Sequence, residues 1–214
     1  MANEAGNSIT PFFTIWTEPR ATIRRIVDTK PTRNVIALAA AGPAISALAG
    51  QWSKALSNNA NLSVLWPLWV AASVVFQAAL GVLFLFIFSA IFKWSGGLLG
   101  GVATRVEVRA ALAWSQVPGI AAATVLLLAV LMGIPIPVPT TPGAFPAIAP
   151  AFYKVMVVET VLAVWGLVVS LKCIGEVHRF SAWRALVALL IPPIIALVVI
   201  GFIVFVVSRL VGHH

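Results

Sequence analysis

Long apolar stretches separated by short charged segments dominate this chain. Five of them reach the roughly 20 residues that an α-helix needs to cross a membrane. They are predicted at residues 35–53, 65–92, 106–132, 153–174 and 183–208. The pattern predicts an all-α polytopic membrane protein, with a cytoplasmic segment at 1–33 followed by a five-helix transmembrane domain at 34–214.

The span count depends on a proline-rich segment. Arg109 and Lys154 enclose enough uncharged residues for two helices, but six prolines lie from Pro135 to Pro150. Proline lacks a backbone N–H and breaks helices, so a second span is excluded in this stretch. The segment is predicted to be an extended connector or a lid on the outer surface.

The stretch before the first span has a helical pattern of another kind. Ile23, Ile26 and Val27 gather on one face of the predicted helix, opposite Arg24 and Arg25. Such a helix lies in the membrane interface with its apolar face toward lipid. We therefore predict an interfacial amphipathic helix, which either helps to set the topology or provides a docking surface for a partner.

Composition agrees with a membrane protein and changes the meaning of the charge. The chain is 61% hydrophobic and only 9% charged, whereas about a quarter of a soluble domain is charged. The net charge of +8 would suggest nucleic acid binding in a soluble protein. No basic cluster here interleaves with aromatic residues on a soluble face, so no nucleic acid partner is expected.

The positions of the basic residues predict the orientation. Eleven of the 14 Lys and Arg residues lie before the first span or in the two connections on the same side, and only Lys54, Lys154 and Arg209 lie on the other. Basic residues collect on the cytoplasmic side. We predict an integral protein of the bacterial inner membrane, with its N-terminus in the cytoplasm and its C-terminus outside. The basic side is expected to contact anionic lipid headgroups or a protein partner. His213 and His214 are excluded from any chemistry.

The connection between the second and third spans holds a capping signal and two pairs of glycines. Thr104 and Glu107 have the spacing of a capping box. Arg105 and Arg109, four residues apart, could bind lipid phosphate or an acidic partner. The glycines form no phosphate-binding motif. The predicted cytoplasmic-face residues are Arg20, Arg24, Arg25, Arg105, Glu107, Arg109, Glu176, His178 and Arg179, with loop glycines Gly96, Gly97, Gly100 and Gly101.

The connection between the fourth and fifth spans contains an acid and a histidine. Glu176 and His178 are two residues apart, so on a helix they point in different directions. They are also too few for a zinc site, and no metal is expected. We expect Glu176 to pair with a nearby arginine and His178 to be hydrated or paired at the end of the fourth span. Ser181 is predicted to cap the next helix, and the single cysteine, Cys173, excludes an intrachain disulfide.

Polar residues at membrane depth are few. Glu159 is ionisable and lies about one and a half turns into the fourth span, so it is a candidate functional group. It either pairs with Lys154 or forms a proton or cation site. Gln77 and Gln116 are further polar residues, of a kind that often joins helices. Together these four residues define a candidate intramembrane polar site, which would serve a conduit for ions, small solutes or lipid.

Motifs for catalysis are absent from the sequence. Neither HExxH nor GxSxG occurs, and a single aspartate, Asp28, cannot form an aspartyl dyad. We predict no enzyme activity, no catalytic residues and no cofactor. Small residues in the first span, from Ala39 to Gly50, allow close helix packing and leave homo-oligomerisation open.

Three stretches together resemble a known family. They are PFFTIWTEPRATIRRIVDTKP, GGLLGGVATRVEVRAALAWSQVP and WGLVVSLKCIGEVHRFSAWRAL. In this order they resemble the bacterial branch of the Yip domain family, the Ypt-interacting proteins, over nearly the whole chain. The resemblance implies five helices, a cytoplasmic N-terminus and a non-enzymatic membrane organiser or adaptor. Eukaryotic relatives bind small Rab-type GTPases and one another, but their DLYGP and GY-type motifs are missing here.

Overall fold

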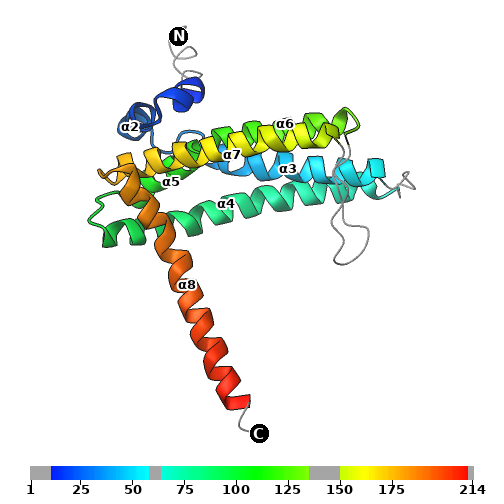
Figure 1. The fold of residues 1–214 in the computed structure, drawn as a ribbon. Helices are drawn as coiled ribbons and strands as arrows, with labels where there is room; N and C mark the ends of the chain where they lie inside the picture. Colours follow the sequence, from blue (N-terminus) through cyan, green and yellow to red (C-terminus); the bar gives the residue numbers. More distant parts are fainter. Residues whose placement is uncertain (1–10, 58–63, 135–149, 212–214) are drawn as a thin grey trace.

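The structure is a computed structural model that describes residues 11–57, 64–134 and 150–211. The proline-rich connector, His213 and His214 therefore lie outside the described residues. The labelled helices are α2 (Pro19–Thr29), α3 (Val35–Ser57), α4 (Trp66–Leu98), α5 (Arg105–Trp114), α6 (Val117–Leu131), α7 (Pro150–Val177) and α8 (Ala182–Val211) (Figure 1). The predicted all-α fold is confirmed.

Four long helices lie side by side as a bundle. Helix α3 packs between α4 and α6, and α6 packs against α7 (Figure 1). Helices α5 and α6 together form one bent span, broken at Ser115 and Gln116 just before Pro118. Proline cannot donate to the carbonyl one turn earlier, so the helix bends there. With α8, the described ranges contain five helical spans long and apolar enough to cross a membrane, as predicted.

The helices extend beyond the apolar spans predicted for them. Helix α3 reaches Ser57, α4 reaches Leu98 and α7 reaches Val177. Lys54 and Lys93, which bound the predicted apolar stretches, both lie inside helices. An apolar window reports the depth of lipid, whereas a helix continues for as long as its backbone hydrogen bonds are made.

Small residues of α3 bring it close to its neighbours. The Gly81 backbone of α4 lies so near α3 that a Cβ there would meet the Ala39 carbonyl and the Pro43 ring. On the other side, a Cβ on Gly42 would lie 3.7 Å from Ile120 of α6. The small residues of the first span therefore serve helix packing within one chain.

The apolar face of helix α2 packs on the ends of α5 and α7. Its residues Ile23 and Ile26 are buried in one core with Val108 of α5 and Val169 of α7. Residues 11–17, also helical, add to the same core. The amphipathic pattern was correctly identified, but it reports only that one face leaves water. The ends of α5 and α7 provide an apolar surface that covers this face.

Helix α8 differs from the other long helices because it leaves the bundle (Figure 1). Near its start, Ala185 and Ala188 are buried, and the helix packs on α7 and α4. Beyond Pro192 and Pro193, every side chain that the structure describes is exposed. Up to Val207 this second half is apolar on all sides, as expected of a helix that is surrounded by lipid.

Candidate functional site

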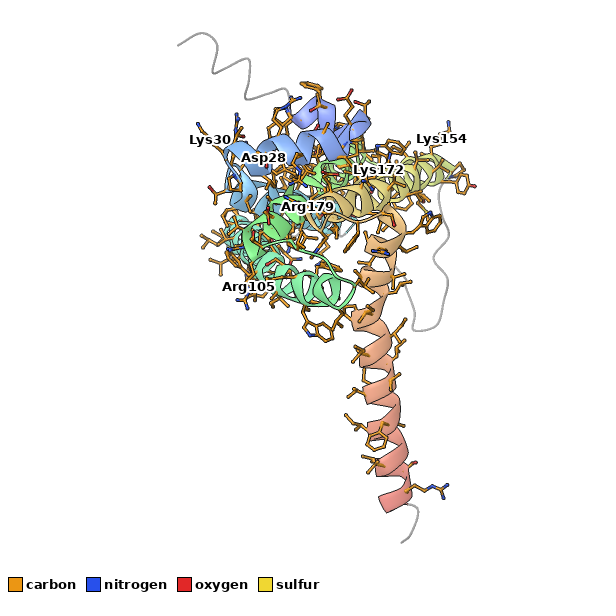
Figure 2. The ribbon with its side chains drawn as sticks, turned by 90° about the vertical axis from the view of Figure 1, so that its left-hand side faces the viewer. Asp28, Lys30, Arg105, Lys154, Lys172 and Arg179 are labelled. Carbon is orange, nitrogen blue, oxygen red and sulfur yellow. The ribbon has the colours of Figure 1, made fainter. Side chains whose placement is uncertain are left out.

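Most charged groups gather at one end of the bundle, which we call the basic end. Here α4 and α7 finish, α5 and α8 begin, and α2 packs across α5 and α7. Figure 2 is turned toward this end and labels Asp28, Lys30, Arg105 and Arg179 on it. Segments far apart in the sequence thus come together as one surface.

A charged contact joins α2 to the end of α7. Arg24 donates from Nε to Glu176 Oε1 at 3.1 Å and from Nη2 to the Glu176 carbonyl at 2.8 Å. Arg20, one turn earlier, lies 3.6 Å from the other carboxylate oxygen. The predicted pairing of Glu176 with a nearby arginine is confirmed, and it ties the N-terminal segment to the bundle.

The only cysteine lies underneath this contact. Cys173 is fully buried on α7, with Sγ 3.8 Å from the Pro19 carbonyl at the start of α2. A hydrogen bond of 2.8 Å between Thr22 and Thr14 also joins α2 to the helix before it. The start of α2 therefore helps to cover the thiol.

An open groove of about 760 Å³ separates α2 from the turn between α7 and α8. Its lining residues are Arg20, Arg24, Asp28, Gly175, Glu176, Arg179, Phe180 and Ser181. Three arginines and two acids leave it with one net positive charge. The predicted cytoplasmic-face residues Arg20, Arg24, Glu176 and Arg179 thus line one concavity.

Arg179 lies in the groove with an unusual backbone conformation. Its φ of 59° is in the left-handed region, where glycine is the normal residue. The turn is held by a hydrogen bond of 2.8 Å from the Phe180 N–H to the Gly175 carbonyl. In this part of the molecule, the structure gives the exposed Arg179 no ion-pair partner.

His178 is buried, which corrects the prediction of a hydrated or paired residue. Its ring is 1% exposed and stacks on Phe180, with 5.1 Å between the ring centroids. Neither ring nitrogen has a hydrogen-bond partner among the described residues. Burial lowers the pKa of His178. The nearby backbone of Phe92 and the carboxylate of Glu107 act in the opposite direction, because they favour the charged ring. The imidazole is therefore held neutral.

The paired glycines make room for this ring. A Cβ on Gly96 or Gly101 would collide with the imidazole of His178. Gly96 and Gly97 lie in the last turn of α4, not in the loop as predicted, because that turn packs against the ring. Only Gly100 and Gly101 lie in the connection, where Gly100 has a φ of 80° and ends the helix.

The start of α5 follows the prediction. Thr104 caps the helix by accepting from the Glu107 N–H at 3.3 Å, and Glu107 accepts from the Thr104 N–H at 2.6 Å. Arg109 lies over the ring of Phe86, 4.9 Å from its centre, whereas Arg105 is exposed. Of the predicted pair, Arg105 is the more accessible. Ser181 caps α8 through a hydrogen bond of 3.4 Å from the Arg184 N–H, as expected.

Trp114 is a central residue that the sequence reading missed. It is fully buried at the end of α5, donates from Nε1 to the Arg33 carbonyl at 3.2 Å, and packs 4.9 Å from Phe12. Tryptophan in membrane proteins normally marks the interface. The available signal was its setting among alanines, because a large ring beside small residues favours a packing centre.

The four residues of the predicted intramembrane site are dispersed. Gln77 is exposed on α4, while Lys154 and Glu159 lie on α7, with α3 and α6 between these two helices. One Glu159 carboxylate oxygen is buried and has no partner within the described ranges. Gln116 instead lines a cavity of about 310 Å³ between α3, α6 and α7. Serines 46, 115 and 170 line the same cavity.

No group of three His, Cys, Asp or Glu side chains that could hold a metal occurs in the part of the chain that the structure describes. The basic end instead offers guanidinium groups and backbone N–H groups, which bind anions by charge and hydrogen bonds. The groups at the basic end are therefore suited to binding anions.

These features define a polytopic, all-helical membrane protein with a basic end closed by an N-terminal helix. The Yip1 domain model matches residues 13–203, so the chain belongs to the Yip1 domain family. Proteins of this family are generally non-enzymatic membrane trafficking proteins. No curated protein and no solved structure matches the chain.

Proposed function

We propose that this protein is a non-enzymatic membrane organiser or adaptor whose basic end lies in the cytoplasm and contacts anionic lipid or a protein partner. The observation that carries the proposal is the groove between α2 and the α7–α8 turn. It is open and positively charged, and the contact of Arg24 with Glu176 holds its two walls together. A preformed charged groove suits binding and needs no catalytic group.

The charge distribution supports the orientation. Eleven of the 14 Lys and Arg residues belong to segments that meet at the basic end or flank it. Such an excess marks the cytoplasmic side, and there it adds attraction to anionic headgroups. We place the protein in the bacterial inner membrane, in the bacterial branch of its family, on the same motifs that indicated the resemblance.

Photo-crosslinking from the basic end tests this proposal. A photoreactive residue at Arg25 or Arg105 leaves the fold intact, because both side chains are exposed. Arg24 is unsuitable because it holds α2 in place. The matched control is the exposed Lys154 at the opposite end of the bundle. We expect specific lipid or protein adducts from Arg25 and Arg105 and few from Lys154.

Equal yields from all three positions would contradict the proposal. The same experiment detects a homo-oligomer, which would appear as an adduct of twice the chain mass. A cross-linked dimer through Arg105 but not through Lys154 would place the contact between copies at the basic end.

A second candidate function is a conduit for ions, small solutes or lipid. It is favoured by the cavity of about 310 Å³ with its serine and glutamine lining, and by the unpartnered oxygen of Glu159. Polar atoms at membrane depth mark transport pathways. Flux into liposomes that Glu159→Gln abolishes, while Gln77→Ala leaves it unchanged, would support this function. Flux unaffected by Glu159→Gln would exclude Glu159 from any pathway.

A further inference from the structure

The groove contains features that point to one kind of ligand. We propose that it binds a phosphate group carried by a membrane lipid, with Arg179 and Arg20 as the principal ligands and the first turn of α8 as the adjoining wall. This inference rests on the proposed function and names the chemistry of the site.

The first argument comes from Arg179. Helices α4 and α7 end in the same way, each with a hydrogen bond that spans five residues and one residue in the left-handed region. In α4 that residue is Gly100, which adopts the conformation without cost. In α7 it is Arg179, for which the conformation is unfavourable. An arginine in a conformation that favours glycine marks its guanidinium as a candidate functional group.

The second argument comes from the unequal roles of the two arginines of α2. Arg24 makes two short contacts with Glu176 and serves as a fixed support. Arg20 makes only the longer contact of 3.6 Å, and 45% of its side chain is exposed. Such an exposed pair contributes little stability, so the Arg20 guanidinium can turn toward a ligand.

The third argument is electrostatic. The groove has one net positive charge, to which the N-terminus of α8 adds about half an elementary charge. Ser181, the cap of that helix, lines the groove. A phosphate monoester carries between one and two negative charges near neutral pH, as a rough value for phosphoserine shows. It therefore complements the groove better than a phosphodiester with a single charge.

The fourth argument concerns the source of the phosphate. The groove lies where α7 ends and α8 begins, beside Trp183, which is 77% exposed. Exposed tryptophan is typical of headgroup depth. At that depth the phosphate nearest to the site belongs to a lipid. The volume of about 760 Å³ is sufficient for a whole headgroup.

The test uses the whole protein in nanodiscs of phosphatidylcholine that contain either phosphatidic acid, a monoester, or phosphatidylglycerol, a diester. Retained lipid is counted by native mass spectrometry. We expect the protein to retain phosphatidic acid preferentially, and Arg179→Gly to lower retention about tenfold, the value of one charged hydrogen bond. Arg20→Ala should lower it severalfold, and the control Lys30→Ala, which removes an exposed positive charge just after α2 and outside the groove lining, should change it less than twofold.

Arg179→Gly is informative because loss of binding cannot be blamed on loss of folding. Glycine relieves the left-handed backbone, so the melting temperature should stay the same or rise while binding falls. Equal retention by Arg179→Gly and the wild type would overturn the proposal. So would an equal loss in Lys30→Ala.

Two further outcomes separate the sources and the proposals. Binding of inorganic phosphate that depends on Arg179, without retention of phosphatidic acid, would overturn the proposal of a lipid ligand. It would support a soluble phosphate compound as the ligand. Lipid adducts from Arg25 and Arg105, with retention that Arg179→Gly leaves unchanged, would refute this site but preserve the proposed function. If neither lipid adducts nor Arg179-dependent retention is observed, both this site and the proposed function are refuted.

Discussion

The span Arg105–Leu131 and the second half of α8 both belong to helices apolar enough to cross a membrane, yet they are organised in opposite ways. In Arg105–Leu131, which begins at the basic end, 39% of an apolar stretch of 18 residues is buried, whereas in α8 every described side chain beyond Pro193 is exposed. The basic end also holds the long-range contacts that involve Glu176, Trp114 and Cys173.

The difference shows what apolar sequence means in a membrane. Lipid tails are as apolar as leucine, so an apolar side chain gains little by leaving lipid for protein. Helices meet where small residues permit close approach or where polar groups need partners. The basic end has both, in its glycines and its arginines, whereas the second half of α8 has only Gly201, with open space around it, and polar residues at its very end, Ser208 and Arg209. The predictions below test this contrast.

The largest effect is expected from a charge placed under α2. Ile23→Asp puts an unpaired carboxylate at a fully buried position, which costs roughly 3–5 kcal/mol and should release α2 from the bundle. Cys173 would then react rapidly with a maleimide, since the start of α2 helps to cover it. The control Ala21→Asp adds the same charge at an exposed position of α2 and should leave Cys173 unreactive. Slow labelling in both variants would show that Cys173 is protected independently of α2.

A large effect is also expected from one methyl group beside His178. In Gly101→Ala the new Cβ collides with the imidazole and lies 2.8 Å from the Gly96 carbonyl, so we expect a loss of about 1–3 kcal/mol. Gly97→Ala meets open space in the last turn of α4 and should stabilise by up to about 1 kcal/mol. Thermal unfolding in detergent measures both. Equal melting temperatures would mean that the ring can move aside.

An intermediate effect should appear on acidification. Burial lowers the pKa of His178 below its ordinary 6.5, so the unfolded chain binds this proton more readily than the folded chain. The stabilisation is therefore complete above about pH 6.5 and is lost as the pH falls toward the lower folded pKa. Lys93 adds to this penalty, whereas Glu107 and the Phe92 carbonyl oppose it. The melting temperature should fall between about pH 7 and pH 5.

The variant His178→Phe provides the control for this pH dependence. Phenylalanine fills the same place beside Phe180 without a titratable group, so the drop in melting temperature should shrink. An undiminished drop in this variant would assign the acid sensitivity to groups other than His178.

A smaller effect is expected from the contact between α2 and α7. Glu176→Gln removes the carboxylate charge but keeps the carbonyl to which Arg24 donates at 2.8 Å. Because this pair is partly exposed, the cost should be about 1 kcal/mol or less. Cys173 labelling should accelerate severalfold, far less than in Ile23→Asp. Labelling as fast as in that variant would make the ion pair, and not the apolar face, the main attachment of α2.

The smallest effect is expected in the outer half of α8. Leu197 is 69% exposed to the surroundings of the bundle, so Leu197→Ala removes no protein contact. The free energy of unfolding, followed by thermal unfolding in detergent, should change by less than about 0.5 kcal/mol. A larger loss, comparable to a core substitution, would show that another copy or another part of the chain covers this half of the helix.

Some features of the candidate site were readable because they are local. The capping box at Thr104 and Glu107 involves neighbouring residues, so spacing sufficed. The pairing of Glu176 was predictable in kind, because an acid among many arginines finds one. The role of His178 was not predictable, because its burial depends on Gly96 and Gly101, about 80 residues earlier in the chain.

The sequence by itself determined the five apolar spans, the amphipathic N-terminal helix and the uneven distribution of charge. Each depends on composition and on hydrogen bonds within one helix, which lipid makes obligatory. Only the tertiary structure decided which surface covers α2, which arginines reach Glu176, and that Arg179 lies in the left-handed region beside a groove. These contacts join helices that share no local sequence pattern. Within the membrane an apolar side chain can face either protein or lipid at similar free energy, so the packing of the helices alone selects its neighbours.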